Sequence, residues 1–65
     1  MQIIIKDFET VETYLEQYDK EAEIKINGNK MLVIHDNGVS NLSICFELLN
    51  NGDSDFLSAI YTTRD

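Results

Sequence analysis

The chain has 65 residues, with 12 acidic and 5 basic side chains, a formal net charge of −7 and a pI near 4.3. This length predicts a single domain, residues 1–65, that buries roughly 60% of the surface of its unfolded chain, which leaves little room for a deep active-site cleft. The acidity disfavours direct contact with nucleic acid or anionic membranes, because phosphates repel carboxylates. We therefore expect an electrostatic partner to be a basic protein.

Cysteine usage and hydropathy predict a cytoplasmic protein. A single cysteine, Cys45, excludes an internal disulfide, whereas small secreted domains usually contain several. No apolar run approaches the length of a signal peptide or of a membrane span of about 20 residues. We expect no contact with the membrane.

The first expected elements are a strand over residues 2–6 and a helix over about 8–20. Asp7 suits the helix N-cap, and Glu9 lies in the first turn, where the helix dipole favours negative charge. Apolar side chains then recur at spacings of three and four, which is one face of a helix. They are Phe8, Val11, Leu15, Tyr18 and Ala22.

From residue 23 onward the apolar period changes to two, which predicts four strands. Each gap between these strands contains an Asn-Gly dipeptide, the strongest short signal for a hairpin. We therefore predict an α+β fold of order β-α-β-β-β-β, an antiparallel meander with the helix packed on one face. The position of the first strand in the sheet stays open. The dipeptides are Asn27-Gly28, Asn37-Gly38 and Asn51-Gly52.

Charge selects the register of the first hairpin. A turn at Asn27-Gly28 sets Lys25 opposite Lys30, which is unfavourable, so a turn at Gly28-Asn29 is preferred. The second hairpin is expected to turn at Asn37-Gly38. The expected cross-strand pairs are Ile26–Met31, Ile24–Val33, Lys25–Leu32, Val33–Leu42 and Met31–Ile44.

The strand pattern assigns Leu57 to the inner face, under the helix, and leaves apolar side chains on the outer face. One helix cannot cover both faces, and an exposed apolar patch is typical of an interface. We predict a homodimer interface there; the alternative is that some of these residues lie at strand ends or under a loop. The predicted interface residues are Leu32, Ile34, Phe56 and Ile60.

Acidic residues repeat at spacings of three, four and three along the expected helix, beside its apolar face. The row from Glu9 through Glu12 and Glu16 to Asp19 is about 15 Å long at 1.5 Å per residue. Its successive carboxylates are about 5 to 6 Å apart. That spacing is comparable with the phosphates of a nucleic-acid strand. The alternative interpretation is an acidic face that only keeps the protein soluble. The predicted partner-binding residues are Asp7, Glu9, Glu12, Glu16, Asp19 and Glu23.

The sequence contains no recognisable set of catalytic or metal-binding residues, so we expect a protein that is not an enzyme and binds no cofactor. His35 and Cys45 suggest a metal site, but strand parity places them on opposite faces. One histidine and one cysteine also fall short of the usual four zinc ligands.

In size, acidity and lack of catalytic residues, the chain resembles phage-encoded inhibitors of host defence, namely anti-restriction, anti-CRISPR and glycosylase-inhibitor proteins. The resemblance is one of type and assigns no role to any residue, because no motif matches one of these families. It implies an inhibitor whose carboxylates take the place of DNA phosphates on a basic protein. The alternative function is a small homo-oligomeric assembly module with an acidic solubilising surface.

Overall fold

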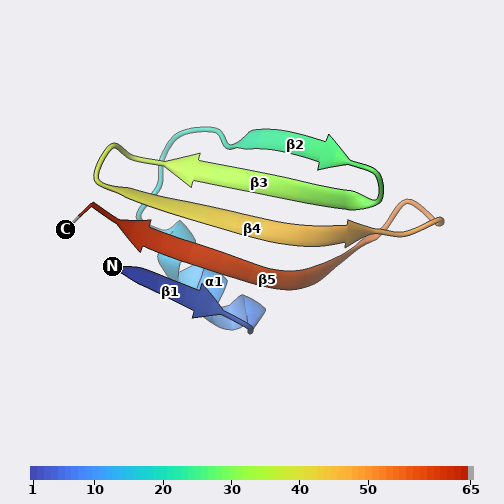
Figure 1. Cartoon of the computed structure of the whole chain (residues 1–65), viewed down its shortest axis with the longest axis horizontal. Coiled ribbons are helices and arrows are strands. Elements are labelled where there is room, and N and C mark those ends of the chain that lie inside the picture. Colours follow the sequence, from blue (N-terminus) through green and yellow to red (C-terminus); the bar gives the residue numbers. More distant parts are fainter. Residues whose placement is uncertain (65) are drawn as a thin grey trace.

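A computed structural model describes residues 1–64 and contains a five-stranded antiparallel sheet and one helix. The strands follow the spatial order β1-β5-β4-β3-β2, so the first strand of the chain lies beside the last (Figure 1). The predicted small α+β domain with an antiparallel sheet is confirmed. The elements are β1 (Gln2–Ile5), α1 (Phe8–Leu15), β2 (Glu23–Asn27), β3 (Lys30–Asp36), β4 (Ser40–Leu48) and β5 (Ser54–Thr63).

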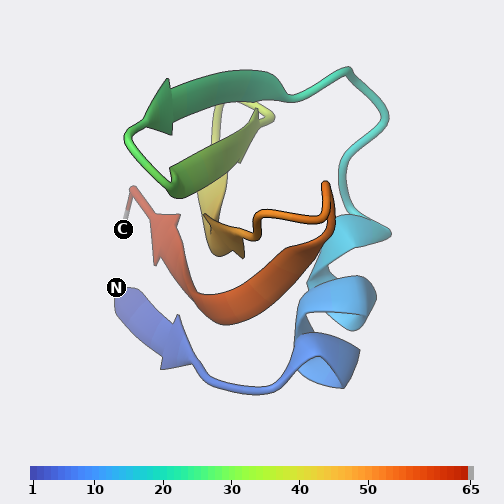
Figure 2. The ribbon, with the colours of Figure 1, turned by 90° about the vertical axis from the view of Figure 1, so that its right-hand side faces the viewer.

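The helix covers only part of one face of the sheet. Among the described residues, α1 contacts β1, β4 and β5 but neither β2 nor β3 (Figure 2). The core under the helix consists of Ile5, Val11, Leu42, Ile44, Ala59 and Tyr61. Ile24 and Ile26 lie on the same face of the sheet, yet they remain 59% and 64% exposed because the helix does not extend over β2.

The helix is shorter than the sequence pattern predicts. It ends at Leu15, after which the N–H groups of Gln17 and Tyr18 donate to the carbonyls three residues earlier, at 3.1 and 3.0 Å. Such tight turns are typical of a helix end. The Tyr18 hydroxyl lies 2.8 Å from Ser40 Oγ, which fixes this end of the helix to the start of β4. From there the chain must cross to β2 at the far edge, so the predicted helical continuation to residue 20 is wrong.

The register of the first hairpin is confirmed, because Lys25 pairs with Leu32 around a Gly28-Asn29 turn. Gly28 has φ +62° at the first turn position, as a type II′ turn requires. The register of the second hairpin is wrong by two residues, since Val33 pairs with Ile44 and not with Leu42.

The second hairpin has a wider loop than predicted because its own side chains bind the loop backbone. Asn37 Oδ1 accepts from the N–H groups of Val39 and Ser40 at 3.0 and 2.8 Å. Asp36 Oδ1 accepts from the Gly38 N–H at 2.7 Å. A shift of two residues changes the pairing but preserves the face of every side chain.

A β-bulge in β5 changes the predicted faces. Cys45 pairs with Ser58, but the next residue, Phe46, pairs with Phe56, so Leu57 is the extra residue. The ring of Phe56 lies on the helix side, 5.5 Å from Phe8 and 6.2 Å from Phe46. Leu57, expected in the core, is 41% exposed. The predicted position of Phe56 on the outer face is therefore wrong, because one extra residue reverses the alternation of the strand.

Candidate partner-binding surfaces

Asp7 caps the start of the helix and precedes its acidic residues in the chain. Its carboxylate accepts hydrogen bonds from the Thr10 N–H at 2.9 Å and from the Thr10 hydroxyl at 2.7 Å. The hydroxyl bond, followed by the backbone bond, holds the pKa of Asp7 below its ordinary value. This side chain is therefore both the N-cap of α1 and a fixed negative charge at neutral pH.

Three glutamates share one side of the helix. At 100° per residue, Glu9, Glu12 and Glu16 lie within an arc of about 60°. All three side chains are exposed, and within residues 1–64 none of them forms an ion pair. The buried Val11 lies on a different side, toward the sheet. The helix thus directs a row of unpaired carboxylates away from the core.

The two remaining predicted acidic residues lie outside the helix. Asp19 follows the tight turns at the helix end, where it is exposed. Glu23 begins β2 and lies on the outer face, opposite Ile34, with its carboxylate 3.7 Å from Lys25 Nζ. The structure therefore does not bring Glu23 together with the others. We define the acidic surface as Asp7, Glu9, Glu12, Glu16 and Asp19.

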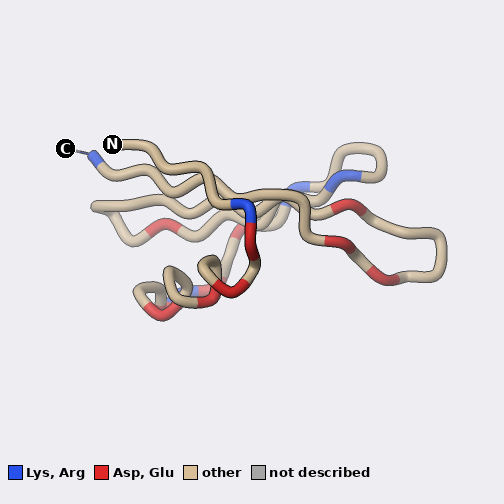
Figure 3. Tube along the Cα trace, turned by 90° about the horizontal axis from the view of Figure 1, so that it is seen from below, with Lys and Arg blue, Asp and Glu red and all other residues tan. Residues whose placement is uncertain are grey.

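The cations lie mainly elsewhere. Both ion pairs found in residues 1–64 involve lysines of β2 and β3, which pair with Glu23 and with Glu47. Figure 3 shows acidic positions along the helix, and basic positions both at the β2–β3 hairpin and beside the start of the helix. Lys6 and Lys20 adjoin Asp7 and Asp19 in the sequence, but within residues 1–64 neither lysine forms an ion pair. The acidic surface is thus not neutralised by side chains from other elements.

The outer face of the sheet is partly apolar, and no described helix covers it. Ile4 and Ile60 form a cross-strand pair and are 62% and 39% exposed. In the same row of residues, Ser43 separates Ile60 from Ile34, while Leu32 lies beside Cys45. Sequence reasoning missed Ile4 because the position of β1 was open. The pattern Ile3-Ile4-Ile5 was the available signal, since one of three successive residues in a strand must face the other way.

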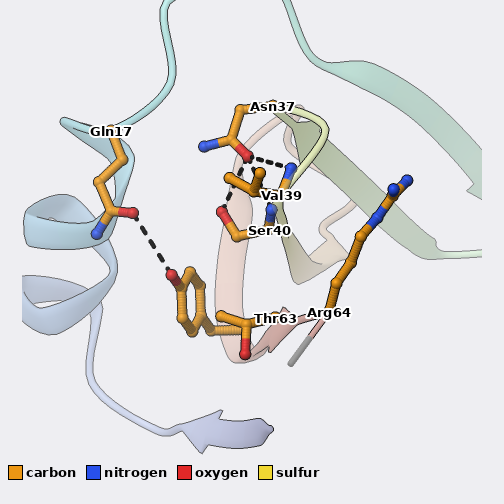
Figure 4. A pocket seen from close by; sticks show the side chains of 7 residues that line it. Gln17, Asn37, Val39, Ser40, Thr63 and Arg64 are labelled. Carbon is orange, nitrogen blue, oxygen red and sulfur yellow. Dashed lines mark hydrogen bonds between the residues drawn. The ribbon is translucent and has the colours of Figure 1, made fainter.

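A hollow with a volume of about 390 Å³ lies between the helix end, the β3–β4 loop and the end of β5 (Figure 4). Its polar groups are bonded to one another: the Tyr61 hydroxyl donates to Gln17 Oε1 at 3.5 Å, and the Ser40 hydroxyl donates to Asn37 Oδ1 at 3.2 Å. No local sequence pattern predicts this hollow, because its walls come from three distant segments. They are formed by Gln17, Asn37, Val39, Ser40, Tyr61, Thr63 and Arg64.

Among residues 1–64, the lining of this hollow lacks the groups that acid–base or metal chemistry requires. Of the described residues that line it, Arg64 is the one with a charge, and none has a carboxylate, an imidazole or a thiol. The side-chain oxygens of Gln17, Asn37, Ser40 and Tyr61 that line it already have partners within the chain.

His35 and Cys45 lie on opposite faces of the sheet, as strand parity predicts. His35 pairs with Leu42 on the helix side, and its ring lies 5.6 Å from that of Tyr18. Cys45 pairs with Leu32 on the outer side. Across residues 1–64 no three histidine, cysteine or acidic side chains are grouped closely enough to hold a metal ion. In the same residues, no helix has the length and apolarity needed to cross a membrane.

Comparison with known proteins gives no matching family model, no matching curated protein and no matching solved structure. The acidic surface and the uncovered faces of the sheet therefore have to be interpreted from their own geometry and charge.

Proposed function

We propose that this chain is a non-catalytic binding protein that presents its acidic surface to a basic, nucleic-acid-binding protein, as an inhibitor of the DNA-mimic type. The observation that carries the proposal is the row of exposed glutamates, Glu9, Glu12 and Glu16, none of which is paired within residues 1–64. Their side chains start from a helix held on the sheet by the fully buried Val11.

The arrangement opposes helix formation, which makes it informative. Like charges at i,i+3 and i,i+4 each cost about 0.2 to 0.5 kcal/mol, and Glu12 has a like neighbour on both sides. A helix of eight residues has little stability of its own, so packing on the sheet must hold it. A basic partner would relieve this repulsion on binding.

The charge also favours rapid encounter with such a partner. Negative charges concentrated on one helix attract a basic surface over a distance, and they repel the phosphates of nucleic acid itself. Because exposed charges are screened beyond a Debye length of about 8 Å at physiological salt, binding should weaken as salt is raised.

The test uses two variants with the same change of charge. In the first, Glu12→Lys and Glu16→Lys reverse the acidic surface; in the second, Asp53→Lys and Asp55→Lys reverse two exposed acids near the start of β5. Each chain is immobilised, exposed to cell extract and washed at low and then high salt. We expect the wild type and the second variant to retain a basic nucleic-acid-binding protein that salt releases, and the first variant to lose it.

Two further measurements sharpen this experiment. Circular dichroism of both variants establishes that the fold is intact. Duplex DNA added to the captured complex should displace the chain if carboxylates occupy a phosphate site. Equal retention by both variants, or a complex that DNA does not disturb, would contradict the proposal.

The second candidate function is a homo-oligomeric assembly module, which the exposed Ile4–Ile60 pair on the outer face favours. In this case Leu32 and Ile34 belong to the subunit contact, and the acidic surface only keeps the assembly soluble. Ile34→Glu should then dissociate the oligomer in sedimentation experiments. A dimer that survives this substitution would exclude the outer face as the contact.

A further inference from the structure

The strand β2 forms one open edge of the sheet (Figure 1). All five of its residues are exposed, including Ile24 and Ile26 on the helix side. Neither a proline nor a bulge interrupts its pairing with β3. Natural sheets block open edges with prolines, bulges or charged side chains, because an open edge can pair with another strand. Of these devices β2 has only charges, of opposite sign, at Glu23 and Lys25.

The geometry of the hairpin shows which backbone groups face this edge. The two-residue turn closes on the pair Asn27–Lys30, and hydrogen-bonded pairs then alternate along the hairpin. Lys25 and Glu23 consequently bond to β3, whereas the N–H and C=O groups of Ile24 and Ile26 point outward. Within β2, a second strand can therefore form backbone hydrogen bonds only with Ile24 and Ile26.

Side-chain charge distinguishes the ways in which two copies of β2 can pair antiparallel. A register centred on Lys25 sets Lys25 opposite its own copy, which is unfavourable. A register centred on Ile24 sets Glu23 opposite Lys25 of the second copy. Because the pair has two-fold symmetry, Lys25 of the first copy also lies opposite Glu23 of the second. In the same register Ile24 lies opposite Ile24 on the helix side, and Ile26 lies opposite Ala22, which directly precedes β2.

We propose that the β2 edge binds a second copy of this chain, antiparallel and centred on Ile24, so that two five-stranded sheets join into one of ten strands. The pairing exchanges the hydrogen bonds of Ile24 with those of its copy. It also replaces the intrachain contact of Glu23 and Lys25, which spans 3.7 Å between exposed side chains, with two contacts between copies.

The net charge of −7 does not prevent this pairing, because the glutamates of the two helices stay apart. The helix contacts β4, β5 and β1, and β4 is two strands away from β2. Across the proposed joint, the nearest helix-bearing strands are five strand spacings apart, about 24 Å at 4.8 Å each. This exceeds the Debye length of about 8 Å at physiological salt.

The proposed contact is small. Two short strands bury much less than the roughly 1,600 Å² of a standard interface, so the dimer should be weak and form as the concentration rises. It uses neither the acidic surface nor the apolar residues of the outer face, and its failure would leave both candidate functions untouched.

The test uses sedimentation equilibrium from micromolar to millimolar concentrations with reciprocal charge variants. Glu23→Lys alone places lysines opposite lysines, and Lys25→Glu alone places glutamates opposite glutamates, so each should raise the dimer Kd by roughly tenfold. The double variant restores opposite charges and should dimerise like the wild type. An equimolar mixture of the two single variants should form a heterodimer tighter than either homodimer.

A second measurement reports the strand itself. Amide exchange at Ile24 and Ile26 should slow as the wild type dimerises, because their N–H groups become bonded. Ile60→Glu, on the outer face of β5 and three strands away from β2, is the matched control and should leave the dimer intact. A wild type that stays monomeric at millimolar concentration, a double variant that fails to recover dimerisation, or a dimer lost in the control would each overturn the proposal.

Discussion

The β-bulge at Leu57 makes a prediction that opposes simple strand alternation. Alternation places Leu57 in the core and Phe56 outside, whereas the structure places the Phe56 ring against the rings of Phe8 and Phe46 and leaves Leu57 41% exposed. Truncation of Phe56 should therefore destabilise the domain much more than truncation of Leu57.

The magnitudes follow from burial. Removal of a fully buried phenylalanine costs about 3 to 5 kcal/mol. Phe56 is only partly buried but also makes aromatic contacts worth about 0.5 to 1.5 kcal/mol each, so we expect Phe56→Ala to cost about 2 to 3 kcal/mol. Leu57→Ala should cost about 1 kcal/mol or less, because its side chain is already in contact with water.

Urea denaturation followed by circular dichroism measures both values from the shift in midpoint at constant slope. A domain of this size has a total stability of roughly 3 to 10 kcal/mol, so Phe56→Ala alone could unfold it. Phe56→Leu provides a milder change that retains apolar volume. If Leu57→Ala proves the more costly substitution, the strand has no bulge at this position and the reasoning is refuted.

Three further predictions concern the helix. Glu12→Lys should raise the free energy of unfolding by about 0.5 to 1 kcal/mol, because it converts the two like-charge contacts with Glu9 and Glu16 into attractions. Salt at 1 M should reduce this gain. A loss of stability would contradict the unpaired state of the helix glutamates. The pKa of Asp7 is lowered in the folded state by Thr10, so its stabilising contribution is present above the ordinary pKa of 3.8 and is lost as pH falls through the folded pKa. Asp7→Asn should make the acid unfolding curve shallower, and an unchanged curve would show that the N-cap contact is absent. Tyr18→Phe should cost about 1 kcal/mol in urea denaturation through loss of the part-buried bond to Ser40, with no loss if that bond does not form.

The sequence by itself determined the elements with strong local signals. Asp7 and the apolar spacing from Phe8 to Leu15 predicted the start and the buried face of the helix, because both depend on residues within a few positions of one another. The charges of Lys25 and Lys30 selected the correct register of the first hairpin for the same reason.

The tertiary structure alone decided features that depend on distant segments. The end of the helix is set by the contact of Tyr18 with Ser40, and the open edge at β2 results from the pairing of β1 with β5. The position of Phe56 depends on a bulge opposite Cys45 and Phe46, for which β5 itself has no glycine or proline signal. The local sequence determines the hydrogen bonds of caps and turns and the alternation of side chains along a strand. Which parts of each sheet face are covered depends instead on which strands pair in the folded chain.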